Sequence, residues 1–423
     1  MKNCVAVLCL LAAGAVSPMS AQEGSVPKGV PHLDHLFLIM MENHAYKQVI
    51  GNPNLPFMNK YANSVNSARN YFAVGHPSLT NYLEIVGGSN FGVRDDNSPD
   101  WHNSACTPNI IGKTVSLEST SRAICPIYGS GTDAATPVID YSNETSGPPG
   151  AIDIDGKLGY AANPNTVAET VADELVNVGL SWKSYQESLP PTGADGVNNA
   201  DGLFSNLDDI PTVLPGSGLT NSSLIGLYAA KHNPFAYFQN VQEGLDPNLS
   251  LQRMAGFEGK GGLFADLASG HVPSFSFIAP NQCNDQHGRS NAGPNCEYDP
   301  NDNGTLVGLN PALMYQGDVT LQTLVTAIHN SDVWQRGNNA IVIVWDENDY
   351  SISPTTNQVL LTVDTNYGPK GVQSENFYTH FSLLKSLEAG FGLRCLNHAC
   401  DPSTAVMSDL FTSDGHHNGD DKQ

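Results

Sequence analysis

Two segments of the chain are almost wholly apolar, and each ends abruptly in acidic residues. His35 to Met41 reads HLFLIMM and is followed by Glu42, and Ala340 to Trp345 reads AIVIVW and is followed by Asp346. A short, continuous apolar run is typical of a strand that is buried on both faces of a sheet. We therefore predict two central strands at these positions.

Shorter apolar and amphipathic segments alternate along the rest of the chain. Apolar residues recur at the spacing that places them on one face of a helix. The pattern predicts helices over 55–68, 78–86, 166–178, 263–269, 317–331 and 379–389, and strands over 181–185, 273–278 and 359–363. This alternation favours an α/β fold with a mostly parallel central sheet and helices on both faces. Ligands of such sheets bind beyond the carboxyl ends of the strands, so we expect the site there.

One long segment departs from the alternation. Ser89 to Gly159 is rich in Gly, Pro, Asn and Asp, which predicts a loop-rich insertion. No internal repeat or low-complexity linker divides the remainder, so we expect a single domain over 22–423.

The N-terminus resembles a secretory signal. Lys2 precedes an apolar stretch from Val5 to Val16, and small residues lead to Ala21, where we expect cleavage. The stretch is too short for a spanning helix, so residues 1–21 predict a secreted or periplasmic protein without stable membrane insertion.

The cysteines fit that compartment. Two of the eight fall in the signal segment, and an even set remains, which predicts disulfides in an exported chain. Pairing of nearest neighbours gives Cys106–Cys125, Cys283–Cys296 and Cys395–Cys400, although other connectivities are open.

The charge balance argues against nucleic acid as a partner. Lys and Arg number 19 against 42 Asp and Glu, which gives a formal net charge of −23. A field of that sign repels a phosphate backbone.

The acids that end the two central strands suggest a metal site. Glu42, Asp346 and Glu347 would lie at adjacent strand ends, and such charges cannot converge unless a cation neutralises them or their pKa values rise. Asn43 could add an amide oxygen. Oxygen ligands suit a hard divalent ion such as Mg²⁺, Ca²⁺ or Mn²⁺, whereas the plain alternative is solvated acids at strand ends.

Ser78 is a candidate nucleophile at the start of a predicted helix. Backbone N–H groups there favour anions, and coordination to a metal would activate a hydroxyl without a histidine base. Asn81, one turn later, could act as an amide donor. The surrounding sequence does not match the G-x-S-x-G elbow of α/β-hydrolases, and the alternative for Ser78 is an ordinary helix cap.

Several motifs together resemble the bacterial and fungal phosphoesterase family. They are FLIMMENHAY (37–46), HPSLTNYL (76–83), YAAKHNP (228–234), FIAPN with NDQH (277–287), VWDE (344–347) and YTHFSLL (378–384). That family joins acid phosphatases with non-specific phospholipases C and is similar in fold to alkaline phosphatases. The motifs span nearly the whole mature chain.

The resemblance implies roles for individual positions. Glu42, Asn43, Asp346 and Glu347 match its metal ligands, Ser78 its nucleophile, and Asp285, His287 and His380 its phosphate pocket; His232 falls in a recurrent motif without an evident physical role. Thr80 stands where relatives usually have proline. His287 or His380 could protonate the leaving group, or these residues with Asp285 could hold a second ion.

These observations predict a secreted, metal-dependent phosphoric-ester hydrolase that acts on small phosphate esters. The HPSLTNYL motif favours an acid phosphatase working through a phosphoserine intermediate, and the net charge motivates an acidic optimum. A phospholipase C-type diesterase on the same scaffold and a non-catalytic binding protein are the alternatives.

Overall fold

The computed structural model describes residues 24–93, 96, 98–99, 127, 166–189, 227–289, 292–348 and 357–412. The signal segment, the Cys106–Cys125 pair and most of the 89–159 insertion lie outside these ranges, so those predictions stay predictions.

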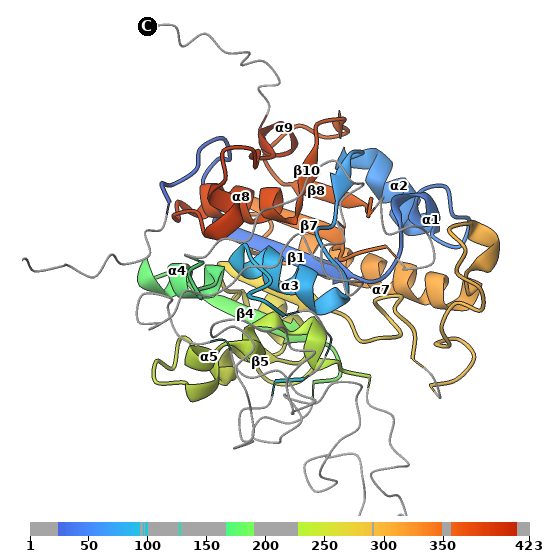
Figure 1. The fold of residues 1–423 in the computed structure, drawn as a ribbon, viewed down its shortest axis with the longest axis horizontal. Helices are drawn as coiled ribbons and strands as arrows, with labels where there is room; N and C mark the ends of the chain where they lie inside the picture. Colours follow the sequence, from blue (N-terminus) through green and yellow to red (C-terminus); the bar gives the residue numbers. More distant parts are fainter. Residues whose placement is uncertain are drawn as a thin grey trace, which may run out of the picture.

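A mixed sheet of eight strands runs through the centre of the molecule (Figure 1). Its strand order is β5-β4-β6-β1-β7-β8-β2-β9. The bounds are β1 (His35–Met41), β2 (Asn66–Ala68), β4 (Trp182–Gln186), β5 (Met254–Ala255), β6 (Phe275–Ala279), β7 (Asn339–Trp345), β8 (Leu361–Thr365) and β9 (Gln373–Ser374). A separate pair joins β3 (Tyr71–Phe72) to β10 (Tyr378–Thr379).

The parallel part of the sheet brings four strand ends to one edge. β1 pairs in parallel with β6 and with β7, and β6 pairs in parallel with β4. β8 is antiparallel to β7. The central strands β1 and β7 are buried throughout apart from His35, which is half-buried, as their unbroken apolar runs predict. The polar residues that follow β1, β4, β6 and β7 therefore converge.

Two groups of helices surround the sheet. Helix α3 (Ser78–Gly87) packs against α4 (Val171–Asn177) and α8 (His380–Phe391), while α7 (Pro311–His329) packs against α2 (Pro56–Ser64) and α6 (Leu263–Ser269). The remaining short helices are α1 (Tyr46–Val49), α5 (Gln239–Glu243) and α9 (Ser408–Phe411), with 3₁₀ turns η5 (Ala230–His232), η6 (Pro234–Tyr237), η7 (Leu251–Arg253), η8 (Leu306–Gly308) and η9 (Asn397–Cys400). Among the helices within the described ranges, none is both long and apolar enough to cross a membrane.

The predicted α/β architecture is confirmed, with corrections at element ends. The helix predicted over 55–68 ends at Ser64, because 66–68 forms β2 between β8 and β9. Helix α7 starts at Pro311, earlier than predicted, because Asn310 caps it by accepting from Ala312 N and Leu313 N. Helix α4 starts late, at Val171, where Thr170 and Asp173 form a capping box.

Two of the predicted disulfides are present. Cys283 is bonded to Cys296, and Cys395 to Cys400. The first closes the loop that follows β6 and so restrains the segment that carries Asp285 and His287.

Candidate functional site

Three strand ends meet at the edge of the sheet. Glu42 follows β1, Asp285 follows β6 and Asp346 follows β7, and all three are at most 1% exposed. Backbone hydrogen bonds fix them together, because Glu42 N donates to Asp285 O at 2.9 Å and Asp346 N to Met41 O at 2.9 Å. The convergence expected from the sequence is therefore observed for these acids.

Ser78 lies at the centre of the acids. Its Oγ is 3.1 Å from Glu42 Oε2 and 3.1 Å from Glu347 Oε1, so carboxylates from two neighbouring strands approach one hydroxyl. Ser78 is the first residue of α3, and Pro77 precedes it as the N-cap. Thr80, which stands where relatives usually have proline, donates its hydroxyl to Pro77 O at 2.8 Å and so ties down the same turn.

Asn81 links Glu347 to the backbone of Gly75. Its Nδ2 donates to Gly75 O at 2.8 Å and to Glu347 Oε2 at 3.3 Å, and its Oδ1 accepts from Gly75 N at 2.9 Å. Both hydrogens of the amide are thus engaged within the protein. The contacts orient Glu347, which also pairs with His76 Nδ1 at 2.5 Å.

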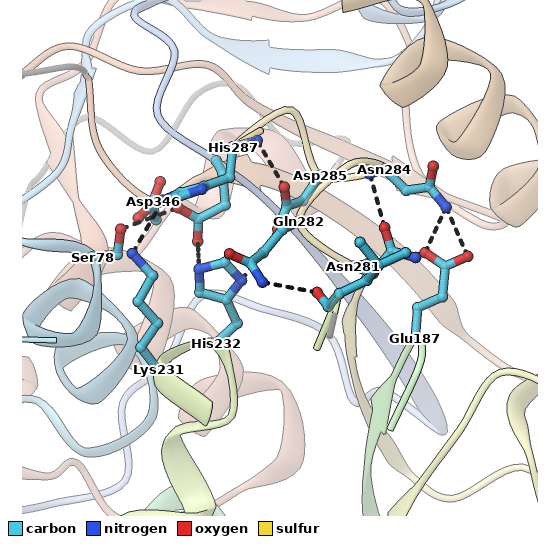
Figure 2. Close-up of polar contacts among 12 residues, drawn as sticks. Ser78, Glu187, Lys231, His232, Asn281, Gln282, Asn284, Asp285, His287 and Asp346 are labelled. Atoms are coloured by element: carbon cyan, nitrogen blue, oxygen red, sulfur yellow. Dashed lines mark hydrogen bonds and ion pairs between the residues drawn. The ribbon is translucent and has the colours of Figure 1, made fainter. Parts of the chain in front are cut away.

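His232 connects two of the acids. Its Nε2 is 3.1 Å from Glu42 Oε1 and its Nδ1 is 3.1 Å from Asp285 Oδ2. The ring stacks on Tyr82, whose hydroxyl donates to Glu42 Oε1. Figure 2 shows the His232 side chain extending from η5 towards Asp285. His232 had no evident physical role in the sequence, and the structure places it in contact with two acids of the site.

His287 also contacts Asp285, and its ring lies beside that of His232, with ring centroids 5.6 Å apart. Its backbone N donates to Asp285 Oδ1 at 2.7 Å, and its Nδ1 lies 2.8 Å from Gly288 O. A carbonyl oxygen only accepts, so Nδ1 carries the proton and Nε2 presents a lone pair. That Nε2 is 3.1 Å from Lys231 Nζ (Figure 2).

Lys231 brings a buried positive charge to the site. Burial opposes its charge, but the negative charges of Asp96, Glu42 and Glu347 raise its pKa above the ordinary value. Its Nζ is 2.9 Å from Asp96 Oδ2.

The donor set fits a divalent cation. One ligand atom each from Glu42, His232 and His287 lies within 4.8 Å of the others. Asp346 Oδ2 is fully buried and, within the described part of the chain, accepts no hydrogen bond. Of the oxygen ligands expected at the ends of β1 and β7, Glu42 belongs to this cluster, and His287 was expected as a possible ligand of a second ion. The two imidazoles would extend the range of suitable ions towards transition metals.

Asn43 takes part through its backbone. Its N–H donates to Asp346 Oδ1 at 3.0 Å, and its φ of 51° places it in the left-handed region that asparagine tolerates better than most residues. This turn links the end of β1 to the end of β7 through that hydrogen bond.

Burial and mutual repulsion disfavour the ionised forms of these acids. Burial and the negative charges of Asp346 and Asp285 raise the pKa of Glu42 well above its ordinary value. Burial also raises the pKa of Asp285, and burial with the charge of Glu347 raises that of Asp346 to about 7. A bound cation would favour the ionised forms of all three.

This environment disfavours the charged forms of the histidines. Burial and the Lys231 charge lower the pKa of His232 well below its usual value and that of His287 to about 3. Burial lowers the pKa of His380 to about 4. The His380 Nε2 lies 2.6 Å from the backbone oxygen of Asp346, and its Nδ1 lies 2.8 Å from the Tyr71 hydroxyl. His380 therefore contacts the backbone of Asp346 and not its carboxylate.

Sequence reasoning missed four residues of the site: His76, Tyr82, Asp96 and Lys231. Lys231 had a signal, because it precedes His232 in the YAAKHNP motif. Asp96 had none, since it falls in the segment that reads only as a loop-rich insertion.

Comparison with known proteins gives consistent matches. The sequence model of the Phosphoesterase family matches residues 52–296. An acid phosphatase of Aspergillus fumigatus is 24% identical over 381 residues, which cover 90% of this chain and 58% of that protein. The phosphatidylinositol-3-phosphatase of Mycobacterium tuberculosis is 24% identical over 412 residues, which cover 95% of this chain and 94% of that protein. This chain thus spans little more than half the length of the fungal relative.

Among solved structures, a protein in the alkaline phosphatase superfamily from Vibrio parahaemolyticus aligns with 90% of this chain and 72% of its own. The identity is 10% and the TM-score is 0.45.

Proposed function

This chain belongs to the Phosphoesterase family, and we propose that it is a secreted, metal-dependent phosphoric-ester hydrolase of the acid phosphatase type that acts through a phosphoserine on Ser78. The observation that carries the proposal is the position of Ser78 Oγ, 3.1 Å from both Glu42 Oε2 and Glu347 Oε1 at the start of α3. A surface hydroxyl or an ordinary helix cap has no need of two buried carboxylates.

The metal ligands come from the strand ends. We assign Glu42, Asp346 and Glu347 to the cation, with Asn43 as the backbone turn that positions Asp346. A bound divalent cation would lower the pKa of the Ser78 hydroxyl and neutralise the charges gathered around it. His232 and His287 are further candidate ligands through the cluster they form with Glu42, and a second ion would use them.

Ser78 supplies the nucleophile. Its Oγ forms a bond to phosphorus as the bond from phosphorus to the leaving oxygen breaks in line with it. The N-terminus of α3 faces the phosphoryl oxygens, where backbone N–H groups stabilise developing negative charge. A water molecule then attacks the phosphoserine and releases inorganic phosphate and the free Ser78 hydroxyl.

The proton lost by Ser78 has to reach the leaving oxygen. In the arrangement without a second ion, Nε2 of neutral His287 carries no proton and is the candidate to accept that proton and return it to the leaving alkoxide. His380 contacts Asp346 and Tyr71, so we give it the role of positioning Asp346. Asp285 in turn positions His232 and His287, and Asn81 positions Glu347.

The test compares a phosphate monoester with the matching diester at acidic pH, with chelator and after metal is added back. Turnover dominated by the monoester and restored by metal would support the proposal, to which the phosphatase names of the two relatives also lend support. Diester-dominated turnover would favour the phospholipase C type. No turnover of either ester would favour a binding protein.

A further inference from the structure

The carboxylate of Asp96 occupies an anion-binding position next to Ser78. Its Oδ1 accepts from Leu79 N at 3.1 Å, and its Oδ2 is 2.9 Å from Lys231 Nζ. Leu79 is the residue after Ser78 in the first turn of α3. One donor is therefore a helix N-terminal amide beside the nucleophile, and the other is a buried ammonium group.

These two donors are suited to a phosphoryl group. Amide N–H groups at a helix N-terminus and a lysine ammonium are the groups that proteins use to bind phosphate oxygens. The Lys231 side chain is only 8% exposed, and Figure 2 shows it extending towards Ser78, Asp346 and His287. A carboxylate and two non-bridging oxygens of a phosphoryl group present the same kind of acceptor to this pair of donors.

The Asp96 side chain is the more accessible partner. It is 32% exposed, against 8% for Lys231, and it belongs to a segment far from the strand ends in the sequence. Its two contacts can be replaced by substrate oxygens without moving a central strand or α3.

We propose that Asp96 is an internal mimic of the substrate: in the resting protein it occupies the phosphoryl subsite formed by Leu79 N–H and Lys231 Nζ, and an ester or inorganic phosphate binds by displacing it. This inference rests on the proposed function of Ser78. Asp96 then weakens the binding of phosphate and holds the subsite in shape while it is empty. No covalent step involves Asp96.

The test measures the affinity for inorganic phosphate by calorimetry in the full chain carrying Ser78→Ala, at one fixed metal concentration. Ser78→Ala prevents turnover, so binding is read independently of hydrolysis. Asp96→Asn keeps the size of the side chain but removes its charge. The control is Asp332→Asn, which removes the same charge from a side chain that is 81% exposed.

We expect Asp96→Asn to tighten phosphate binding roughly tenfold, the factor that corresponds to loss of one competing charge-assisted hydrogen bond. Asp332→Asn should leave the affinity unchanged. Lys231→Met should weaken binding, and Asp96→Asn should give little gain in the Lys231→Met background because the two residues act on one subsite.

Two results would overturn the inference. Weaker or unchanged phosphate binding in Asp96→Asn would make Asp96 a structural partner of Lys231. An undiminished gain in the Lys231→Met background would make the effect one of general charge. The proposed function fails by a different measurement, namely the absence of ester hydrolysis by the unmodified chain or its persistence in Ser78→Ala.

Discussion

Ser78 Oγ and Glu42 Oε2 lie 3.1 Å apart, although one begins α3 and the other follows β1. The contact joins the first turn of a helix to the end of a central strand. A second contact from the same helix supports it, because Tyr82 donates to the other oxygen of Glu42. The proposed nucleophile and the acid beside it are thus fixed by regular elements, which hold a site geometry more precisely than loops.

Replacement of Ser78 should separate chemistry from folding. We expect Ser78→Ala to lower kcat for a phosphate monoester by on the order of a thousandfold or more, because no other hydroxyl is in contact with both carboxylates in the described site. The melting temperature should be nearly unchanged, because removal of one hydroxyl leaves the apolar packing of α3 intact. The matched control is Thr323→Ala, which removes a hydroxyl from the exposed side of α7. Activity retained in Ser78→Ala would refute the nucleophile.

Replacement of Glu42 should remove the metal and the activity together. Glu42→Gln keeps the shape of the side chain but removes a charge that contacts Ser78 and His232. We expect metal affinity to fall by at least the roughly 10–100-fold that loss of a supporting residue costs. Metal content and a thermal melt with and without chelator provide the measurement. A variant that binds metal as tightly as the unmodified chain would exclude Glu42 from the ligand set.

The two candidate histidines should respond differently to substitution. His287→Gln keeps an acceptor beside Lys231 but removes the basic ring nitrogen, so we expect kcat to fall about 100-fold, within the range of general acid–base catalysis. His380→Gln retains a side-chain donor towards the Asp346 backbone oxygen, so it should preserve most of the activity and the shape of the pH profile. His380→Ala leaves that buried oxygen without a donor and should lower both kcat and the melting temperature.

The outcome for metal content identifies the role of His287. A proton-relay residue leaves the bound metal in place when it is replaced, whereas a ligand does not. Loss of metal from His287→Gln would therefore move His287 from proton transfer to the cluster that it forms with Glu42 and His232. Loss of the acidic limb of the pH profile in His380→Gln would instead indicate that His380 takes part in proton transfer.

The activity should have an acidic optimum. The chain carries a formal net charge of −23, which repels a dianionic monoester most at high pH. As the pH falls, surface carboxylates and the substrate gain protons, so the repulsion weakens. A profile of kcat/KM against pH at low and high salt tests this, because salt should flatten the alkaline fall. A maximum above about pH 8, beyond the second ionisation of a phosphate ester, would contradict the expectation.

Much of this site could be predicted from the chain because it follows the sheet. The runs HLFLIMM and AIVIVW identify β1 and β7, and a parallel sheet has to bring Glu42 and Asp346 to one edge. Contacts that depend on loops could not be predicted. Asp96 reaches Lys231 across 135 positions in the sequence, and neither residue belongs to a periodic pattern that would indicate the encounter.

The ends of elements were less predictable for the same physical reason. Residues 66–68 continue a helical pattern, yet they pair with β8 and β9, and Asn66 Nδ2 also donates to Pro369 O and Leu410 O. These partners lie some three hundred positions away. Tertiary hydrogen bonds of this kind outweigh local propensity, which spans only about 1 kcal/mol per residue.

A buried acid far from the Ser78 site should make stability depend on pH. Asp364 is 1% exposed and contacts Tyr61 OH at 3.0 Å, His329 Nε2 at 2.9 Å and Lys370 Nζ at 2.9 Å. Burial alone would raise its pKa, but the hydrogen bonds and charges of His329 and Lys370 hold it below the ordinary value. The ionised form is therefore favoured by folding.

The sign of the effect follows from that shift. Because the folded pKa lies below the unfolded value of about 3.9, the stabilisation is present above that pH and is lost as the pH falls through the folded pKa. We expect Asp364→Asn to lower the free energy of unfolding by about 1–3 kcal/mol at pH 7, with the lower part favoured because Lys370 is 52% exposed. Urea unfolding of both proteins between pH 7 and pH 3 measures the difference. It should shrink on acidification, and a difference that stays constant or grows would show that packing, not the charge of Asp364, stabilises this region.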